Sequence, residues 1–330
     1  MSANKKDLYL HIGVHRTATT AIQAAMFHNW KWLKDQGILY PFGVERHIGM
    51  FNNIFHGKVK AQDLAVDLAR RADSHDTAIH TIVMSDEDVS MRKDLSPLLP
   101  FKEHFNVKVI FGMRRQDLWL ESWWAQNVKG QWDRQLCHVT WDDFMADRQR
   151  FHWINYDAYL SHLEKLFGSS NIKPYVFEKE QMPKGAIAAF CRQFGLHDIS
   201  GMKPRGGSNI SLCPEVSEFV RHLPLIEAKM GVRLNLIDIA EVVDKQIRTE
   251  NGATLLIPHE QRRAIMQEYD RGNNAVARRY FNRDRLFLEE LPGQDAAVIT
   301  PALPKSPDEV MTRLVAPFFG ELIRRLNMIS

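Results

Sequence analysis

Residues 7–23, DLYLHIGVHRTATTAIQ, place an apolar run, a glycine, an arginine and several threonines in an order that suits anion binding. The apolar run, residues 8–12, predicts a buried parallel strand, and Gly13 allows the backbone to turn sharply after it. Three hydroxyls follow near the start of a helix, on Thr17, Thr19 and Thr20. Because a helix N-terminus offers unpaired amides and a positive dipole end, this segment predicts a cradle for phosphate or sulfate. The alternative is an ordinary turn with a hydroxyl cap.

The same segment differs from a Walker A phosphate loop, G-x-x-x-x-G-K-[ST], at two positions. Ala18 stands in place of the second glycine and Thr19 in place of the lysine, while Arg16 supplies a cation three residues earlier. A P-loop kinase, with Thr20 and Asp86 as magnesium ligands, is therefore an alternative that the missing lysine counts against.

An arginine followed by Thr-Ala-Thr-Thr, directly after a strand and a turn, resembles the 5′-phosphosulfate loop of sulfotransferases that use 3′-phosphoadenosine 5′-phosphosulfate (PAPS). That family usually has Lys-Thr-Gly-Thr-Thr here, and branches of the carbohydrate sulfotransferases carry Arg-Thr-Gly-Ser-Ser. The resemblance implies donor contacts along the loop, from Gly13, His15, Arg16, Thr17, Ala18, Thr19 and Thr20. Because the arginine departs from the common pattern, a nucleotide-binding protein that has lost catalysis stays an alternative.

A run of acids follows the β-branched segment at residues 78–84 and reads Ser85-Asp86-Glu87-Asp88. Ligands of open parallel sheets bind outside the carboxyl ends of the strands, so we expect this run to share a crevice with the loop after the first strand. A helix cap at Ser85 or Asp86 is the competing interpretation, and the two are compatible. The family resemblance implies that Glu87 is the general base, with Asp86 as the alternative.

A third strand, residues 107–113, delivers Arg114 and Arg115 to the same edge of the sheet. Ser122 follows Arg114 by eight residues in an expected helix, so its hydroxyl can reach back to a phosphate that the guanidinium holds. This spacing is similar to the arginine and serine that bind the donor's 3′-phosphate in sulfotransferases. Arg115 is expected to contact the phosphate, to pair with an acid of the helix, or to be solvated.

A glycine-rich loop at residues 202–214, MKPRGGSNISLCP, carries Lys203 and Arg205. It predicts a cationic loop that folds over the phosphates of the nucleotide, in general similarity to a late loop of the sulfotransferase fold. A surface turn leading into the helix from Pro214 is the alternative.

Together these residues predict transfer of a sulfuryl group from PAPS to a hydroxyl or amine of an acceptor by in-line displacement. Catalysis would come from alignment and from cations placed where charge develops on the leaving oxygens, with Arg16 in that role and Glu87 taking the acceptor's proton. This chemistry requires no metal. The acceptor is expected to be a glycan or a small metabolite. Residues 42–58, rich in Gly, His and Asn, are expected to form a solvated loop or one wall of its pocket.

Composition excludes several other classes of protein. The 330 residues are 45% hydrophobic, and 43 basic against 40 acidic residues give a net charge of +3, so no general nucleic-acid surface is expected. Three widely spaced cysteines predict neither a disulfide framework nor a metal cluster and fit a reducing cytoplasm. No apolar run approaches the length of a membrane span. We therefore expect a soluble, cytoplasmic, bacterial enzyme.

The expected fold is α/β, with a P-loop-like parallel sheet of about four to five strands flanked by helices in residues 1–212. Residues 213–330 are expected to form a mainly helical annex packed on this core. Its pattern Asn-x-x-Val-Ala-x-x-Tyr, residues 273–280, resembles bacterial sulfotransferases associated with surface polysaccharides. A last amphipathic helix, residues 309–326, is expected to dock on the core or to make a homo-oligomer.

Overall fold

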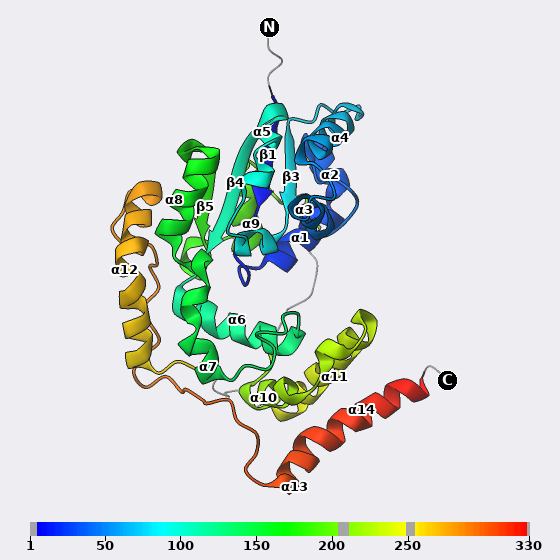
Figure 1. Ribbon diagram of the computed structural model, residues 1–330, viewed down its shortest axis with the longest axis vertical. Helices are drawn as coiled ribbons and strands as arrows, with labels where there is room; N and C mark the ends of the chain where they lie inside the picture. Colours follow the sequence, from blue (N-terminus) through cyan, green and yellow to red (C-terminus); the bar gives the residue numbers. More distant parts are fainter. Residues whose placement is uncertain (1–4, 204–210, 249–254, 329–330) are drawn as a thin grey trace. The chain divides into compact units, whose positions relative to one another are not determined.

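The computed structural model describes residues 5–203, 211–248 and 255–328 (Figure 1). The chain divides into two compact units, each assembled from segments that are distant in sequence. The first unit contains Met1–Arg115, Phe151–Gly207 and Glu268–Glu289, and the second contains Gln116–Arg150, Ser208–Gln267 and Glu290–Ser330. In contrast to the expected division at residue 212, the second unit takes in residues 116–150 and the first takes in residues 268–289.

The first unit is built on a five-stranded sheet in the order β2-β3-β1-β4-β5, and every strand pair in it is parallel. The strands are β1 (Asp7–His11), β2 (Ile38–Leu39), β3 (Thr81–Ser85), β4 (Asn106–Met113) and β5 (Ile172–Val176). This confirms the expected α/β class. From β1 the chain builds β2 and β3 on one side and β4 and β5 on the other. The topological switch point, where open α/β sheets bind ligands, is therefore the carboxyl end of β1.

Helices flank this sheet along its length (Figure 1). They are α1 (Thr19–His28), α2 (Trp30–Asp35), α3 (Ile48–Phe55), α4 (Ala61–Asp73), α5 (Phe101–His104), α8 (Tyr156–Phe167), α9 (Gly185–Arg192) and most of α12 (His259–Phe281). Helix α8 packs on β4 and β5, and α1 packs against α9. The cradle segment therefore folds as expected into strand, turn and helix.

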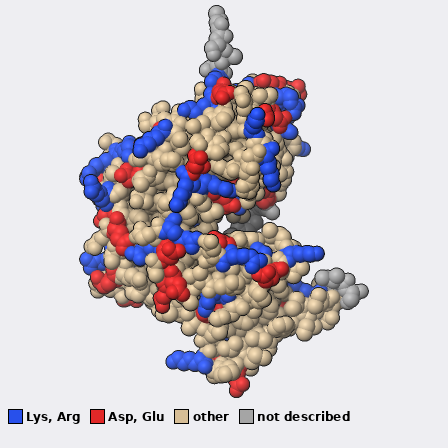
Figure 2. Space-filling view, viewed as in Figure 1, with Lys and Arg blue, Asp and Glu red and all other residues tan. Residues whose placement is uncertain are grey.

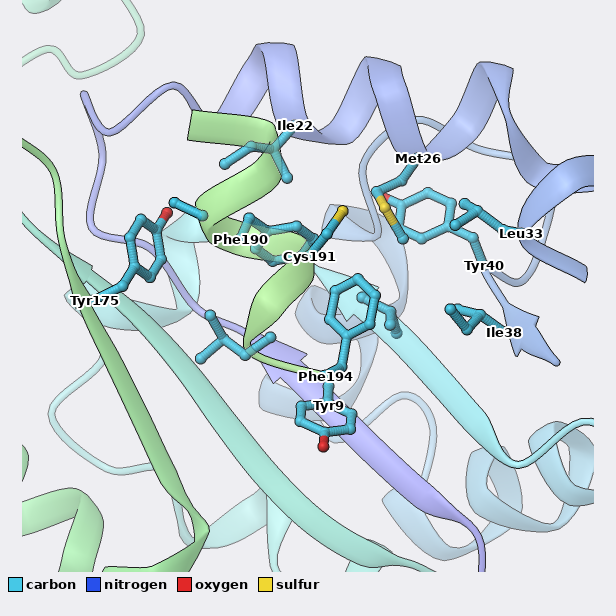
Figure 3. Packing of buried hydrophobic residues seen from close by; sticks show 13 residues of the cluster. Tyr9, Ile22, Met26, Leu33, Ile38, Tyr40, Tyr175, Phe190, Cys191 and Phe194 are labelled. Atoms are coloured by element: carbon cyan, nitrogen blue, oxygen red, sulfur yellow. The ribbon is translucent and has the colours of Figure 1, made fainter. Parts of the chain in front are cut away.

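The core on one face of the sheet fixes α1 and α9 in place (Figure 3). Tyr9 of β1 and Tyr175 of β5 contribute from the strands, Ile22 and Met26 from α1, and Phe190 from α9. All of these side chains are buried. At about 25 cal/mol per Å² of apolar surface removed from water, each contributes on the order of 2 kcal/mol. This packing anchors the helix whose N-terminus follows the switch-point loop.

The second unit is helical. It contains α6 (Gln116–Gly130), α7 (Trp141–Ala146), α10 (Pro214–His222), α11 (Met230–Ile247), α13 (Pro307–Val310), α14 (Ala316–Asn327) and the first turns of α12. A fully buried arginine, Arg262, pairs with Asp117 at 2.5 Å and with Glu121 at 2.7 Å. Glu121 also accepts hydrogen bonds from the amides of Leu256 and Ile257. This network joins α6 to the start of α12, and removal of Arg262 would leave two buried carboxylates uncompensated.

The last helix presents two apolar faces. Leu314 and Phe318 lie in the core that α14 shares with α11, whereas Phe319, Ile323 and Leu326 are more than half exposed. Self-association through the exposed face stays a prediction. Within the described ranges, no helix combines the length and the apolar character needed to cross a bilayer.

One local prediction needs correction. Residues 42–58 are not one long loop, because Ile48–Phe55 form α3 and bury Phe51 and Ile54. The glycine and asparagines there suggested a loop, but the apolar residues supply a buried helix face. Helix α1 ends at Asn29, whose backbone amide donates to the carbonyls of Ala25 and Phe27 before α2 begins.

Candidate anion site at the switch point

The loop after β1 passes very close to the carboxyl ends of β3 and β4. Gly13 has a positive φ of 111°, and a Cβ at this position would lie 3.2 Å from the Cβ of Glu87 and 3.3 Å from Ser90 Oγ. The amide of Val14 donates to the carbonyl of Gly112 at 3.1 Å. The positive φ favours glycine at residue 13, and a side chain there would also crowd Glu87 and Ser90. The loop is held between the two neighbouring strands.

Two further residues of the loop adopt the left-handed conformation, Arg16 at φ 67° and Ala18 at φ 60°. Ala18 is the N-cap of α1 and stands where the resembled families have glycine. A non-glycine residue in this region costs on the order of 1 kcal/mol. Thr17, fully buried, donates its hydroxyl proton to the carbonyl of Val14 at 2.6 Å. Thr19 is also buried, whereas Thr20 is exposed.

Two guanidinium groups meet at this loop. Arg114, which follows β4, donates from Nη1 to the backbone carbonyl of Arg16 at 2.9 Å. Burial, and then the positive charge of Arg114, lower the pKa of Arg16 to about 10. The backbone amide of Arg114 donates to the hydroxyl of Tyr156 at 3.0 Å, and its guanidinium lies 5.8 Å from the centroid of the Phe177 ring. Cationic charge is thus gathered at the start of α1, where a helix dipole also favours an anion.

The acid run lies on the β3 side of the same loop. Asp86 is the N-cap of a 3₁₀ helix, Glu87–Met91, and accepts from the amide of Asp88. Asp86 therefore forms the helix cap that was the competing interpretation of this run. The acid run also lies at the carboxyl end of β3, as expected. Arg46, from the segment between β2 and α3, reaches this run: its Nη2 lies 2.6 Å from Asp86 Oδ1 and 2.6 Å from Asp88 Oδ1.

Glu87 is buried and held by several groups. Gln23 of α1 donates to Glu87 Oε2 at 2.6 Å, and Arg46 Nε lies 3.4 Å from the same oxygen. Burial by itself raises the pKa of Glu87, but the charges of His15 and Arg46 and the bond from Gln23 outweigh it, and the pKa is lowered. Glu87 is therefore ionised at neutral pH.

The two flanking acids have opposite shifts. Burial raises the pKa of Asp86 to about 6, against the lowering effect of Arg46. Burial also acts to raise the pKa of Asp88, but the hydrogen bond from His15 Nε2 at 2.8 Å and the charge of Arg46 bring it down to about 2. Asp88 is thus the carboxylate that orients the imidazole of the loop residue His15.

The remaining predicted site residues are not all brought to the loop. Arg115 is buried rather than solvated, and donates to the carbonyl of Glu289 at 3.1 Å. Ser122 is buried on α6 of the second unit, and its pairing with Arg114 stays a prediction. The amide of Lys203 donates to the side chain of Asn29, at the other end of α1, about 15 Å from the loop for a helix of ten residues. Arg205 lies outside the described residues.

Sequence reasoning missed Arg46 and Gln23. Nothing in the local sequence around Arg46 indicates its partners, because they lie 40 residues further on and meet it through the pairing of β2 with β3. Gln23 had a weak signal, since it sits on the first turns of the helix that follows the loop. Across the described ranges, no three His, Cys, Asp or Glu side chains are arranged to hold a metal ion.

Charge elsewhere on the molecule gives no competing anion surface on the face shown in Figure 2, where basic and acidic side chains are interspersed. This agrees with the near balance of charge in the sequence. The candidate anion site is therefore defined by the residues of the loop and not by a basic patch on this face.

Comparison with known proteins finds a distant, uncharacterized relative. No protein-family model matches the chain, and no solved structure shows a significant match. An uncharacterized protein of Archaeoglobus fulgidus is 23% identical over 206 residues, which are 59% of this chain and 52% of that protein. The chain thus spans about half the length of this relative, and the inference about function has to come from the site.

Proposed function

We propose that this chain is a sulfotransferase, which moves the sulfuryl group of PAPS to a hydroxyl or amine of a glycan or small metabolite. One observation carries the proposal: Arg16 and Arg114 bring two guanidiniums together at a helix start, while a buried carboxylate, Glu87, packs on the same loop at Gly13. A donor with a 5′-phosphosulfate and a 3′-phosphate offers the two anionic groups that such a pair of cations suits.

Each group has a role in this reaction. Arg16 and the amides at the start of α1 would hold the 5′-phosphosulfate and stabilise charge as it develops on the leaving oxygen. Arg114 would hold the 3′-phosphate. Glu87 would accept the proton of the acceptor as the sulfur–oxygen bond to the acceptor forms and the bond to the leaving phosphate breaks. Correct alignment of donor and acceptor supplies much of the remaining acceleration.

The alternatives use the same loop differently. A P-loop kinase would need Asp86 as a magnesium ligand, whereas this carboxylate is engaged by Arg46 and by the amide of Asp88. A nucleotide-binding protein without catalysis would use Arg16 and Arg114 but not Glu87. These differences make the alternatives separable by experiment.

The test is to incubate the purified chain with ³⁵S-labelled PAPS and a panel of neutral, amino and acidic sugars and small hydroxyl compounds, with and without EDTA. Transfer of label that EDTA leaves unchanged supports the proposal. Binding of adenosine 3′,5′-bisphosphate without transfer to any acceptor favours the non-catalytic alternative. Magnesium-dependent use of ATP contradicts the sulfotransferase assignment.

A further inference from the structure

We propose that Arg46 is a positioning residue for Glu87, which holds this carboxylate ionised and orients one of its oxygens for proton transfer; this inference rests on the proposed function. Arg46 is not part of the strand–turn–helix or of the acid run. It reaches the acid run from the segment that precedes α3.

The guanidinium of Arg46 contacts three consecutive carboxylates. Its contacts are 2.6 Å to Asp86, 2.6 Å to Asp88 and 3.4 Å to Glu87. The acids lie one after another at a strand end, so they repel one another, and the side chains of Asp86 and Glu87 are nearly inaccessible to solvent. Without a cation among them, at least one buried carboxylate would take up a proton.

Orientation follows from which oxygen is contacted. Gln23 donates to Glu87 Oε2, and Arg46 approaches the same atom. The two contacts come from different elements, α1 and the segment before α3, so together they fix the plane of the carboxylate. Oε1 is then the oxygen to which the acceptor's proton would go.

Other charged or titratable groups also face Glu87, and a pH experiment has to take them into account. From the first strand and its loop these are His11 and His15, from the segment after β2 they are Tyr40 and Arg46, and on its own helix they are Asp86 and Asp88. The 3₁₀ helix His152–Ile154 also packs against the helix of Glu87, and the ring of its His152 contacts Trp153 and Tyr159. Among these groups that face Glu87, Arg46 is the arginine, so its substitution removes the guanidinium charge from them.

The matched control is Arg92, which directly follows the helix of the acid run. Its guanidinium donates to Asn52 at 2.8 Å and lies 4.9 Å from the centroid of the Phe55 ring instead of contacting the acids. Arg46→Met and Arg92→Met each remove one positive charge. The first removes a guanidinium that contacts the carboxylates, and the second removes one that contacts α3 instead.

The first measurement is a ¹³C NMR titration of the Glu87 carboxyl carbon, assigned with Glu87→Gln, in the wild type and in both methionine variants. Arg46→Met is expected to raise the pKa of Glu87 by about 1 to 3 units, the size of effect that an opposite charge within a few ångströms has on a carboxyl group. Arg92→Met is expected to leave it unchanged. An unchanged Glu87 pKa in Arg46→Met would overturn the proposal.

The second measurement is the pH dependence of kcat/KM for sulfuryl transfer. In Arg46→Met the acidic limb is expected to move to higher pH by the same amount, and Arg46→Lys, which keeps the charge but not the fork, is expected to restore most of the limb's position. If Arg46→Met does not fold, Arg46→Lys still tests whether the guanidinium orients the Glu87 carboxylate. A kcat equal to that of the wild type in Arg46→Lys would contradict this orienting role. Absence of turnover in the wild type would reject the proposed function, while the NMR result would still test the effect of Arg46 on Glu87.

Discussion

Two half-buried arginines at the same edge of the sheet, Arg16 and Arg46, have opposite electrostatic surroundings. Burial acts against the charge of both. Around Arg46 the three acids 86–88 overcome burial and raise its pKa, whereas burial and the neighbouring Arg114 lower the pKa of Arg16 to about 10. The acid side of the loop is thus compensated within the protein, and the cationic side is stabilised when an anion binds. Under the proposed function we therefore expect the donor on the cationic side of the loop and the acceptor on the acid side.

The largest expected effect on kcat comes from a substitution that removes the proposed general base, Glu87, and leaves Arg16 and Arg114 in place. Glu87→Gln should lower kcat by about 10² to 10⁴, the contribution typical of a positioned general base, while donor affinity stays nearly unchanged. Steady-state transfer assays, with calorimetric titration of adenosine 3′,5′-bisphosphate, measure the two quantities separately. If most of the activity survives, Asp86 or the pair of His15 and Asp88 becomes the better candidate for the base.

The acid side should also make folding pH-dependent through His47. This buried imidazole accepts from the amide of Ser85 at 3.1 Å, and its other nitrogen is 3.1 Å from the carbonyl of Pro41. Burial lowers its pKa to about 4, so the unfolded chain binds the proton more readily than the folded chain between pH 6.5 and 4. The contribution of neutral His47 to the free energy of unfolding is therefore complete above pH 6.5. It falls by up to about 3 kcal/mol as the pH drops to 4.

Urea unfolding of the wild type and of His47→Gln at several pH values measures this contribution. The difference between their unfolding free energies should shrink as the pH falls through this range. Asp86 acts in the opposite sense, because its raised pKa makes stability fall as pH rises from about 4 to about 6. Comparison of the two chains cancels that effect. His56→Gln, at an exposed position after α3, is the control, and an equal pH dependence in His47→Gln and wild type would contradict the prediction.

On the cationic side, Arg114→Ala should weaken binding of adenosine 3′,5′-bisphosphate by about 1.5 to 3 kcal/mol, the range for hydrogen bonds to charged groups. The expected loss is specific to the 3′-phosphate, so affinity for adenosine 5′-phosphosulfate should change less. Arg92→Ala serves as the control for removal of an arginine that contacts α3 instead of the loop. Equal losses for both ligands would place Arg114 away from the 3′-phosphate.

The smallest expected effect concerns the loop backbone. Ala18→Gly should stabilise the chain by about 0.5 to 1 kcal/mol, because relief at a left-handed φ exceeds the extra entropy of an unfolded glycine. Ala21→Gly, at an exposed helical position in α1, should instead destabilise by about 1 kcal/mol. Urea midpoints of the two variants give the signs, and destabilisation by Ala18→Gly would show that the strain is absent.

Much of this site was predictable because its parts are local. The run from Leu8 to Thr20 contains strand, turn and helix start in one continuous pattern, and apolar segments before Glu87 and Arg114 identify the neighbouring strands. Since carboxyl ends of parallel strands meet at one edge, the sequence was sufficient to bring these groups to the same edge.

The sequence did not predict the positions of Arg46 and Lys203, because both lie in loops whose paths depend on tertiary contacts. Arg46 contacts the acid run because β2 pairs with β3, and no spacing in the chain encodes that approach. The path of residues 202–203 was likewise not predictable, because Lys203 is placed by a hydrogen bond to Asn29 rather than by a repeating pattern. Loop positions set by single tertiary contacts leave no periodic signal in a sequence.

Calorimetric titration of the wild-type chain with adenosine 3′,5′-bisphosphate and with adenosine 5′-monophosphate tests the central claim most directly. An anion site built by Arg16 and Arg114 predicts saturable one-site binding of the bisphosphate, with affinity at least about tenfold greater than for the monophosphate. Equal affinities, or no binding of either nucleotide, would contradict the account.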